Sequence, residues 1–113
     1  MKVAIPTPTN TNETIANPRF GRANFFCIVD SKTGEKEFIA NPAIEAAHGA
    51  GVQSGQLLID QNVEAVISAK YGPNASSVLR SGNIKMFLFP DGSSLKIEDL
   101  MADLNSNKLV ELS

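Results

Sequence analysis

The chain has 113 residues, of which 42% are hydrophobic and 19% charged, and this composition is typical of one ordinary globular domain and not of a disordered segment. Its formal net charge of -2 argues against a nucleic-acid binder, because such proteins normally carry a basic excess. No stretch approaches the roughly 18 apolar residues of a membrane span, and the first apolar run is too short for a secretory signal, so we expect a soluble cytoplasmic protein with no membrane partner.

The amino-terminal part of the chain predicts three strands. Residues 2–6 are apolar and end in proline, which fits a buried strand. A polar stretch rich in Thr and Asn follows over residues 7–24, and long loops of this kind are usually functional or mobile. Residues 25–30 form the next expected strand, and turn chemistry at residues 31–34 predicts a hairpin with a third strand over residues 35–40. Charged and apolar side chains are interleaved along this third strand, so we expect it to be half exposed at an edge of the sheet.

Helices and strands alternate in the next part of the chain. The patterns predict helices over residues 51–62 and 73–81, and strands over residues 63–68 and 84–89. Gly55 lies inside the first of these helices, where glycine costs about 1 kcal/mol against alanine. We therefore expect this helix to approach the sheet closely at Gly55.

The end of the chain completes an α/β pattern. A last helix is expected to begin between residues 93 and 98 and to run to about residue 105. The chain then forms a single domain over residues 1–113, with a core of 1–104 and a short tail of 105–113. Strand–helix–strand units favour parallel, right-handed pairing, so the three most apolar strands should occupy the middle of the sheet. We expect a five-stranded mixed sheet in the order 3-2-1-4-5, with strand 2 antiparallel and helices on both faces.

This strand order predicts where a ligand would bind. Ligands of open α/β sheets tend to lie at the carboxyl ends of the strands where the chain order changes direction, which here is between strands 1 and 4. Those ends are Pro6-Thr7 and Ser68-Ala69-Lys70. Helix starts present unpaired N–H groups and a partial positive charge, which suit an anion. Two glycine-marked helix starts, at residues 48–51 and 71–74, could border the same rim.

Several side chains are candidates for this site. Arg19 and Arg22 flank Phe20-Gly21 in the long loop, where they would clamp an anion or else belong to a solvated turn. Lys70 ends a central strand. His48 is the only histidine, and it would either donate an imidazole nitrogen to iron or make a backbone or solvent hydrogen bond at a helix start. Tight turns explain the neighbouring glycines, and an anion cradle is a second, compatible role.

Other chemistries find less support in the residues. Cys27 is the only cysteine, which excludes an intrachain disulfide, and it lies mid-strand, where cysteine mostly behaves as a small hydrophobe. One thiolate cannot hold an iron–sulfur cluster, which usually takes four. The glycine pattern is neither a P-loop nor a dinucleotide fingerprint. Asp30 has no evident carboxylate partner, so a metal-dependent nuclease is rejected, and we assign no catalytic residue.

Five short segments carry a family resemblance through their order and spacing. They are residues 1–6, Arg19-Phe20-Gly21-Arg22-Ala23 with Phe25-Phe26 following, Asn41-Pro42, His48-Gly49-Ala50-Gly51-Val52 and Gly72-Pro73-Asn74-Ala75. Together they resemble the dinitrogenase iron–molybdenum cofactor biosynthesis family over about residues 1–104. The resemblance implies a ribonuclease H-like three-layer α/β/α fold. It also implies binding of an iron–sulfur or iron–molybdenum cluster, or its precursor, with protein partners in cluster assembly.

One position departs from the family pattern. Cluster-binding members often carry a histidine just before the Phe-Gly of the first loop, and Arg19 stands there in this chain. An arginine cannot donate a lone pair to a metal, but it can pair with an anion. Electrostatic binding of an anionic cluster therefore remains consistent with this loop.

We accordingly expect a non-enzymatic carrier of an anionic iron–sulfur or iron–molybdenum cluster or its precursor. The alternative is a small regulatory or interaction module that binds a small anion or a protein partner and no cluster, and an enzyme is a third alternative. The sequence does not decide the oligomeric state. The predicted cofactor-binding residues are Arg19, Phe20, Gly21, Arg22, His48, Gly49, Gly51 and Lys70, with His48 as the metal ligand.

Overall fold

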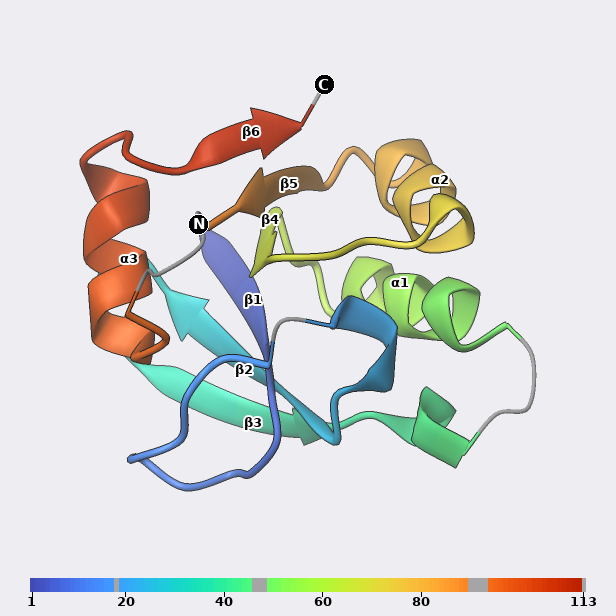
Figure 1. Ribbon diagram of the computed structural model, residues 1–113, viewed down its shortest axis with the longest axis horizontal. Coiled ribbons are helices and arrows are strands. Elements are labelled where there is room, and N and C mark those ends of the chain that lie inside the picture. Colours follow the sequence, from blue (N-terminus) through green and yellow to red (C-terminus); the bar gives the residue numbers. More distant parts are fainter. Residues whose placement is uncertain (18, 46–48, 90–93, 113) are drawn as a thin grey trace.

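The computed structural model describes residues 1–17, 19–45, 49–89 and 94–112. Its centre is a mixed sheet of six strands in the order β3-β2-β1-β4-β5-β6 (Figure 1). The predicted order of the first five strands is confirmed, including the antiparallel second strand. The parallel strands are β1 (Lys2–Thr7), β4 (Ala65–Ser68) and β5 (Lys85–Leu88), and β2 (Phe25–Asp30) runs antiparallel to its neighbours β1 and β3 (Lys36–Ala40).

The sixth strand corrects the prediction of a five-stranded sheet with a tail over residues 105–113. β6 (Val110–Leu112) pairs antiparallel with β5, and Glu111 lies opposite Phe87. Three residues are too few to show a periodic pattern of their own, and Val110 is 60% exposed. This segment is a strand because the edge of β5 offers it a ladder, which is a tertiary effect that local sequence does not carry.

Three layers are formed because helices cover both faces of the sheet. α1 (Ala50–Asp60) and α2 (Pro73–Ser81) lie side by side on one face, and α3 (Ile97–Asn105) covers the other (Figure 1). Pro73 at the first position of α2 has a fixed backbone angle that suits a helix start, so the predicted bounds of this helix are confirmed. Within the described ranges, no helix is long and apolar enough to cross a membrane.

The strand side chains alternate between the two faces and divide the core in two. Their burial against helices on each side explains why the middle strands are almost wholly apolar. The cluster on the α3 face includes Val3, Ile5, Cys27, Ile67, Ile97 and Leu100. The cluster on the face of α1 and α2 includes Ala4, Phe20, Phe26, Val66, Leu58 and Leu79.

The long polar connection from β1 to β2 is anchored along its course. The Asn17 N–H donates to Pro6 O at 2.7 Å, and the Ala16 N–H donates to Leu95 O at 2.8 Å. A short 3-10 helix, η1 (Phe20–Arg22), follows and packs on α1. These contacts hold the connection against the carboxyl ends of the strands.

Gly55 brings α1 against α2, and the prediction that it approaches the sheet is wrong. A Cβ atom at Gly55 would lie 2.9 Å from Cγ1 and 3.2 Å from Cβ of Val78, which belongs to α2. Separations this short leave no space for a side chain. The glycine in α1 therefore sets the distance between the two helices.

Replacing Gly55 with leucine should lower the free energy of unfolding by about 1–3 kcal/mol, because overpacking in a filled interior displaces its neighbours. Urea denaturation measures this change. Gln53→Leu is the matched control, since Gln53 lies exposed on the same helix and should change stability little. Equal denaturation midpoints for the two variants would contradict the close helix contact.

Candidate functional site

A cavity of about 380 Å³ opens beyond the carboxyl end of β4, where the amino-terminal ends of α1 and α2 meet η1. Its wall comes from three segments that are distant in sequence, around residues 19–21, 49–51 and 70–75. The lining residues are Arg19, Phe20, Gly21, Gly49, Ala50, Gly51, Lys70, Gly72, Pro73, Asn74 and Ala75.

Most of the site residues predicted from the sequence come together at this cavity. Those that line it are Arg19, Phe20, Gly21, Gly49, Gly51 and Lys70. His48 lies outside the described residues. The backbone of Arg22 belongs to η1, but its side chain is not among the parts that the structure describes.

Two cationic residues lie next to each other at the cavity. Arg19 and Lys70 are partners in an isolated parallel bridge, and the Phe20 N–H donates to Lys70 O at 3.3 Å. Both cations are exposed, and the ion pair between Lys36 and Glu98 lies elsewhere. Like charges at neighbouring positions of paired chains repel each other. An anion between the two side chains would remove that repulsion.

The first N–H groups of α1 and α2 border the cavity, and the N-cap residue of neither helix has a side chain that could cap them. The residues before the two helices are Gly49 and Gly72, and neither helix has an acidic residue in its first turn. α3 differs, because Glu98 and Asp99 occupy its first turn. Unpaired N–H groups and the positive ends of two helix dipoles thus lie at the same cavity.

Small residues allow the three segments around the cavity to meet. A Cβ atom at Gly51 would lie 3.0 Å from Cβ of Ala75, and one at Gly21 would lie 3.4 Å from the backbone nitrogen of Gly51. Gly49 has a φ of 74°, a left-handed backbone conformation that residues with a side chain rarely adopt. Larger residues would separate η1 from the helix starts, so the structural interpretation of these glycines accounts for the local geometry.

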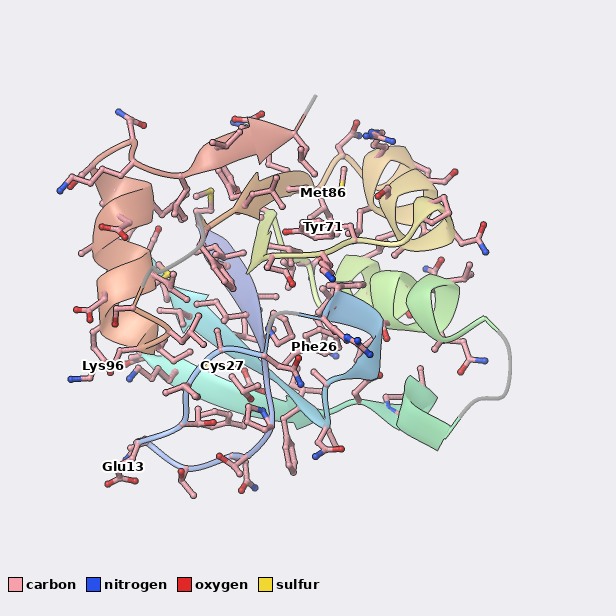
Figure 2. The ribbon with its side chains drawn as sticks, in the orientation of Figure 1. Glu13, Phe26, Cys27, Tyr71, Met86 and Lys96 are labelled. Atoms are coloured by element: carbon pink, nitrogen blue, oxygen red, sulfur yellow. The ribbon has the colours of Figure 1, made fainter. Side chains whose placement is uncertain are left out.

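Aromatic rings pack beneath the cavity on the face of α1 and α2. Phe20 is 1% exposed, and its ring centroid lies 5.4 Å from that of Phe26 and 5.8 Å from that of Tyr71. The Tyr71 hydroxyl donates to Phe87 O at 2.8 Å and also lies 3.1 Å from Val66 O. Burial raises the pKa of Tyr71 well above its usual value, so the hydroxyl stays protonated. Figure 2 shows Phe26 and Tyr71 within this layer.

Cys27 lies away from the cavity, in the core on the α3 face of the sheet (Figure 2). Burial raises the pKa of its thiol to about 11, so the thiolate is scarce at neutral pH. In the parts of the chain that the structure describes, no group of three or more His, Cys, Asp and Glu side chains could hold a metal ion. The described wall of the cavity therefore offers cations and N–H donors.

Asn74 was not selected from the sequence as a ligand contact, although it lines the cavity. It is exposed and occupies the second position of α2. The sequence predicts a helix start at Gly72-Pro73-Asn74, but the predicted cofactor-binding residues are mostly cations and glycines. The neutral polar residue in the first turn was the available signal.

Comparison with known proteins places these features in a family context. The family model described as dinitrogenase iron-molybdenum cofactor matches residues 1–107. The uncharacterized protein MJ0580 of Methanocaldococcus jannaschii is 37% identical over 90 residues, which cover 77% of this chain and 73% of that protein.

Two solved structures have the same fold. A Thermotoga protein with a provisional assignment as NifB shares 30% identity and a TM-score of 0.82, over 98% of this chain and 92% of that chain. The apo form of the orange protein from Desulfovibrio gigas has a TM-score of 0.90 at 23% identity, over 99% of this chain and 92% of that chain, and shows likeness of fold alone. By the match over residues 1–107, the chain belongs to the dinitrogenase iron-molybdenum cofactor family.

Proposed function

We propose that this protein is a non-enzymatic carrier that binds an anionic iron–sulfur or iron–molybdenum cluster, or its precursor, in the cavity between η1, α1 and α2. One observation carries the proposal: Arg19 and Lys70 are held as bridge partners beside two helix starts whose N-cap residues are glycines. Membership of the family supports a role connected with this cofactor. The order of the first five strands also supports the ribonuclease H-like classification, which we include in the proposal.

The donor set suits a cluster that already has its inner ligands. Guanidinium, ammonium and backbone N–H groups donate to outer sulfur or oxygen atoms and displace no ligand from a metal. Arg19 and Lys70 would balance the charge, and the small residues would let the backbone approach the cluster. Arg22 as a further cation and His48 as a metal ligand stay predictions of the sequence. Protein partners in cluster assembly would supply and receive this cargo.

Anaerobic reconstitution with iron and sulfide tests the carrier function, with the tetrathiomolybdate anion as a simpler probe. The wild-type protein should gain a visible absorption that co-purifies with it. Arg19→Ala and Lys70→Ala should each weaken the affinity for tetrathiomolybdate about tenfold, since a hydrogen bond to a charged group contributes about 1.5 kcal/mol.

Lys32→Ala is the control for general charge effects, because Lys32 is exposed in the turn between β2 and β3. Its affinity for the probe should equal that of the wild type. The carrier proposal fails if the reconstituted wild-type protein shows no cluster absorption or paramagnetic signal, and if Arg19→Ala combined with His48→Ala changes nothing.

A small regulatory or interaction module, which binds a small anion or a protein partner and no cluster, is the second candidate. Arg19 favours it, because this residue stands where cluster-binding members often carry a histidine. The position of Cys27 on the far face of the sheet favours it too. Calorimetry with phosphate, nucleotides and small carboxylates separates the two functions. Heat of binding from one of these ligands, with none from tetrathiomolybdate, would select the second candidate.

A further inference from the structure

We propose that Tyr71 is the positioning residue of the anion site, because it ties the segment that bears Lys70 both to the sheet and to the segment that bears Arg19. This inference rests on the proposed function of the cavity. Tyr71 does not line the cavity itself. It acts through its two neighbouring segments, Lys70 before it and Gly72–Ala75 after it.

The first tie is to the sheet. Tyr71 lies just after the end of β4, where the chain turns towards α2. Its hydroxyl donates to Phe87 O of β5 at 2.8 Å and lies 3.1 Å from Val66 O of β4. Two adjacent strands thus hold one side chain, and a bond to buried backbone is costly to lose. This anchor fixes the height of Lys70 and of the α2 start above the sheet.

The second tie is to the loop that bears Arg19. The Tyr71 ring lies 5.8 Å from the ring of Phe20, which is itself packed on Phe26 of β2. Such ring pairs contribute specific geometry as well as buried area. Phe20 is the residue next to Arg19, just as Tyr71 is the residue next to Lys70. Each cation is therefore next in sequence to an aromatic residue, and the two aromatic rings pack against each other.

The bridge between the cations needs this support. It is an isolated bridge and is not part of a longer β-ladder, so few backbone hydrogen bonds hold it. Mutual repulsion of Arg19 and Lys70 would open it. The ring contact and the hydroxyl anchor oppose this opening, so loss of the anchor should let the cations separate and should weaken their joint action on an anion.

Tyr71→Phe removes the hydroxyl and keeps the ring. Its affinity for tetrathiomolybdate, measured by titration well below the melting temperature, should be about five- to tenfold weaker than that of the wild type. Arg19→Ala should then cost less in the Tyr71→Phe background than in the wild type, because the two cations no longer act together. A merely structural role would lower the denaturation midpoint and leave the affinity unchanged.

Ile97→Val is the control for stability, since Ile97 is the first residue of α3 and is buried on the other face of the sheet. It should lower the midpoint and leave the affinity as in the wild type. A second measurement needs no variant, because Tyr71 is the only tyrosine in the chain. In NMR spectra, wild-type protein with isotope-labelled tyrosine should show one set of ring resonances that shifts on addition of tetrathiomolybdate. The dissociation constant from these shifts should equal that from the absorption titration.

The outcomes separate this inference from the proposed function. Wild-type binding together with unchanged affinity in Tyr71→Phe, or with unshifted ring resonances, overturns the role of Tyr71 and leaves the carrier function standing. Absence of binding by the wild type overturns the carrier function and the inference with it. Weaker affinity in Tyr71→Phe with reduced cost of Arg19→Ala supports both.

Discussion

Asn74→Asp should weaken the binding of tetrathiomolybdate by about a hundredfold or more and raise the stability of the fold. A hundredfold loss corresponds to about 2.7 kcal/mol. Repulsion between a carboxylate and a dianion a few ångströms away, near a protein surface, amounts to several kcal/mol. In the folded protein the same carboxylate would lie in the first turn of α2, where an acid is worth about 0.3–1 kcal/mol. Thermal unfolding and a binding titration measure the two effects.

Opposite signs in these two measurements distinguish a binding residue from a structural one. Asn105→Asp is the matched control, because it makes the same change of charge at the last residue of α3. An acid there is unfavourable to the helix dipole, so this variant should lose a little stability and keep its affinity. If Asn74→Asp binds the probe like the wild type, the anion does not lie at the start of α2.

Asn41→Ala should lower the free energy of unfolding by about 2–4 kcal/mol, a large share of the 5–15 kcal/mol of a typical domain. Asn41 is 2% exposed, and its amide nitrogen donates to Ala23 O at 2.9 Å. Its amide oxygen accepts from the Ala43 N–H at 3.1 Å and from the Ser54 hydroxyl at 3.2 Å. The substitution would leave three buried polar groups without this partner. Urea denaturation measures the loss.

A double-mutant cycle with Ser54→Ala tests whether these bonds form one network. Ser54→Ala should cost less in the Asn41→Ala background than in the wild type, because its partner is already gone. Costs that simply add would show that the Ser54 hydroxyl contributes independently of Asn41. The network joins the end of η1 to α1, so the folded Asn41→Ala protein should also bind the probe more weakly.

The fold could be predicted where the pattern of side chains is local. Pro73 and the apolar run after Glu64 gave the bounds of α2 and the place of β4, because a helix start and a buried strand each have chemistry of their own. β6 could not be predicted, since Val110 is exposed and the strand exists through its partner. Gly55 indicated a close packing contact, but the sequence alone does not show whether the sheet or another helix makes that contact.

The candidate site likewise has features that the sequence predicts and features that depend on the folded structure. Arg19 and Lys70 were expected at one rim because strand order determines which ends meet, and both line the cavity. Their pairing in a bridge depends on the course of the β1–β2 connection, which is held by contacts such as that of Ala16 with Leu95. Asn74 could not be predicted as a site residue, because an uncharged side chain indicates a binding role only once its position at the cavity is known.

The direction of β6 affects how this domain could be joined to other polypeptides. β6 runs antiparallel to β5, so Leu112 lies opposite Met86, near the amino-terminal ends of the parallel strands, where β1 also begins at Lys2. A fused partner or affinity tag at either terminus would be attached at this end of the strands. The rim with Arg19 and Lys70 lies at the other end of the parallel strands. Fusion at either terminus should therefore leave the opening of the cavity unobstructed.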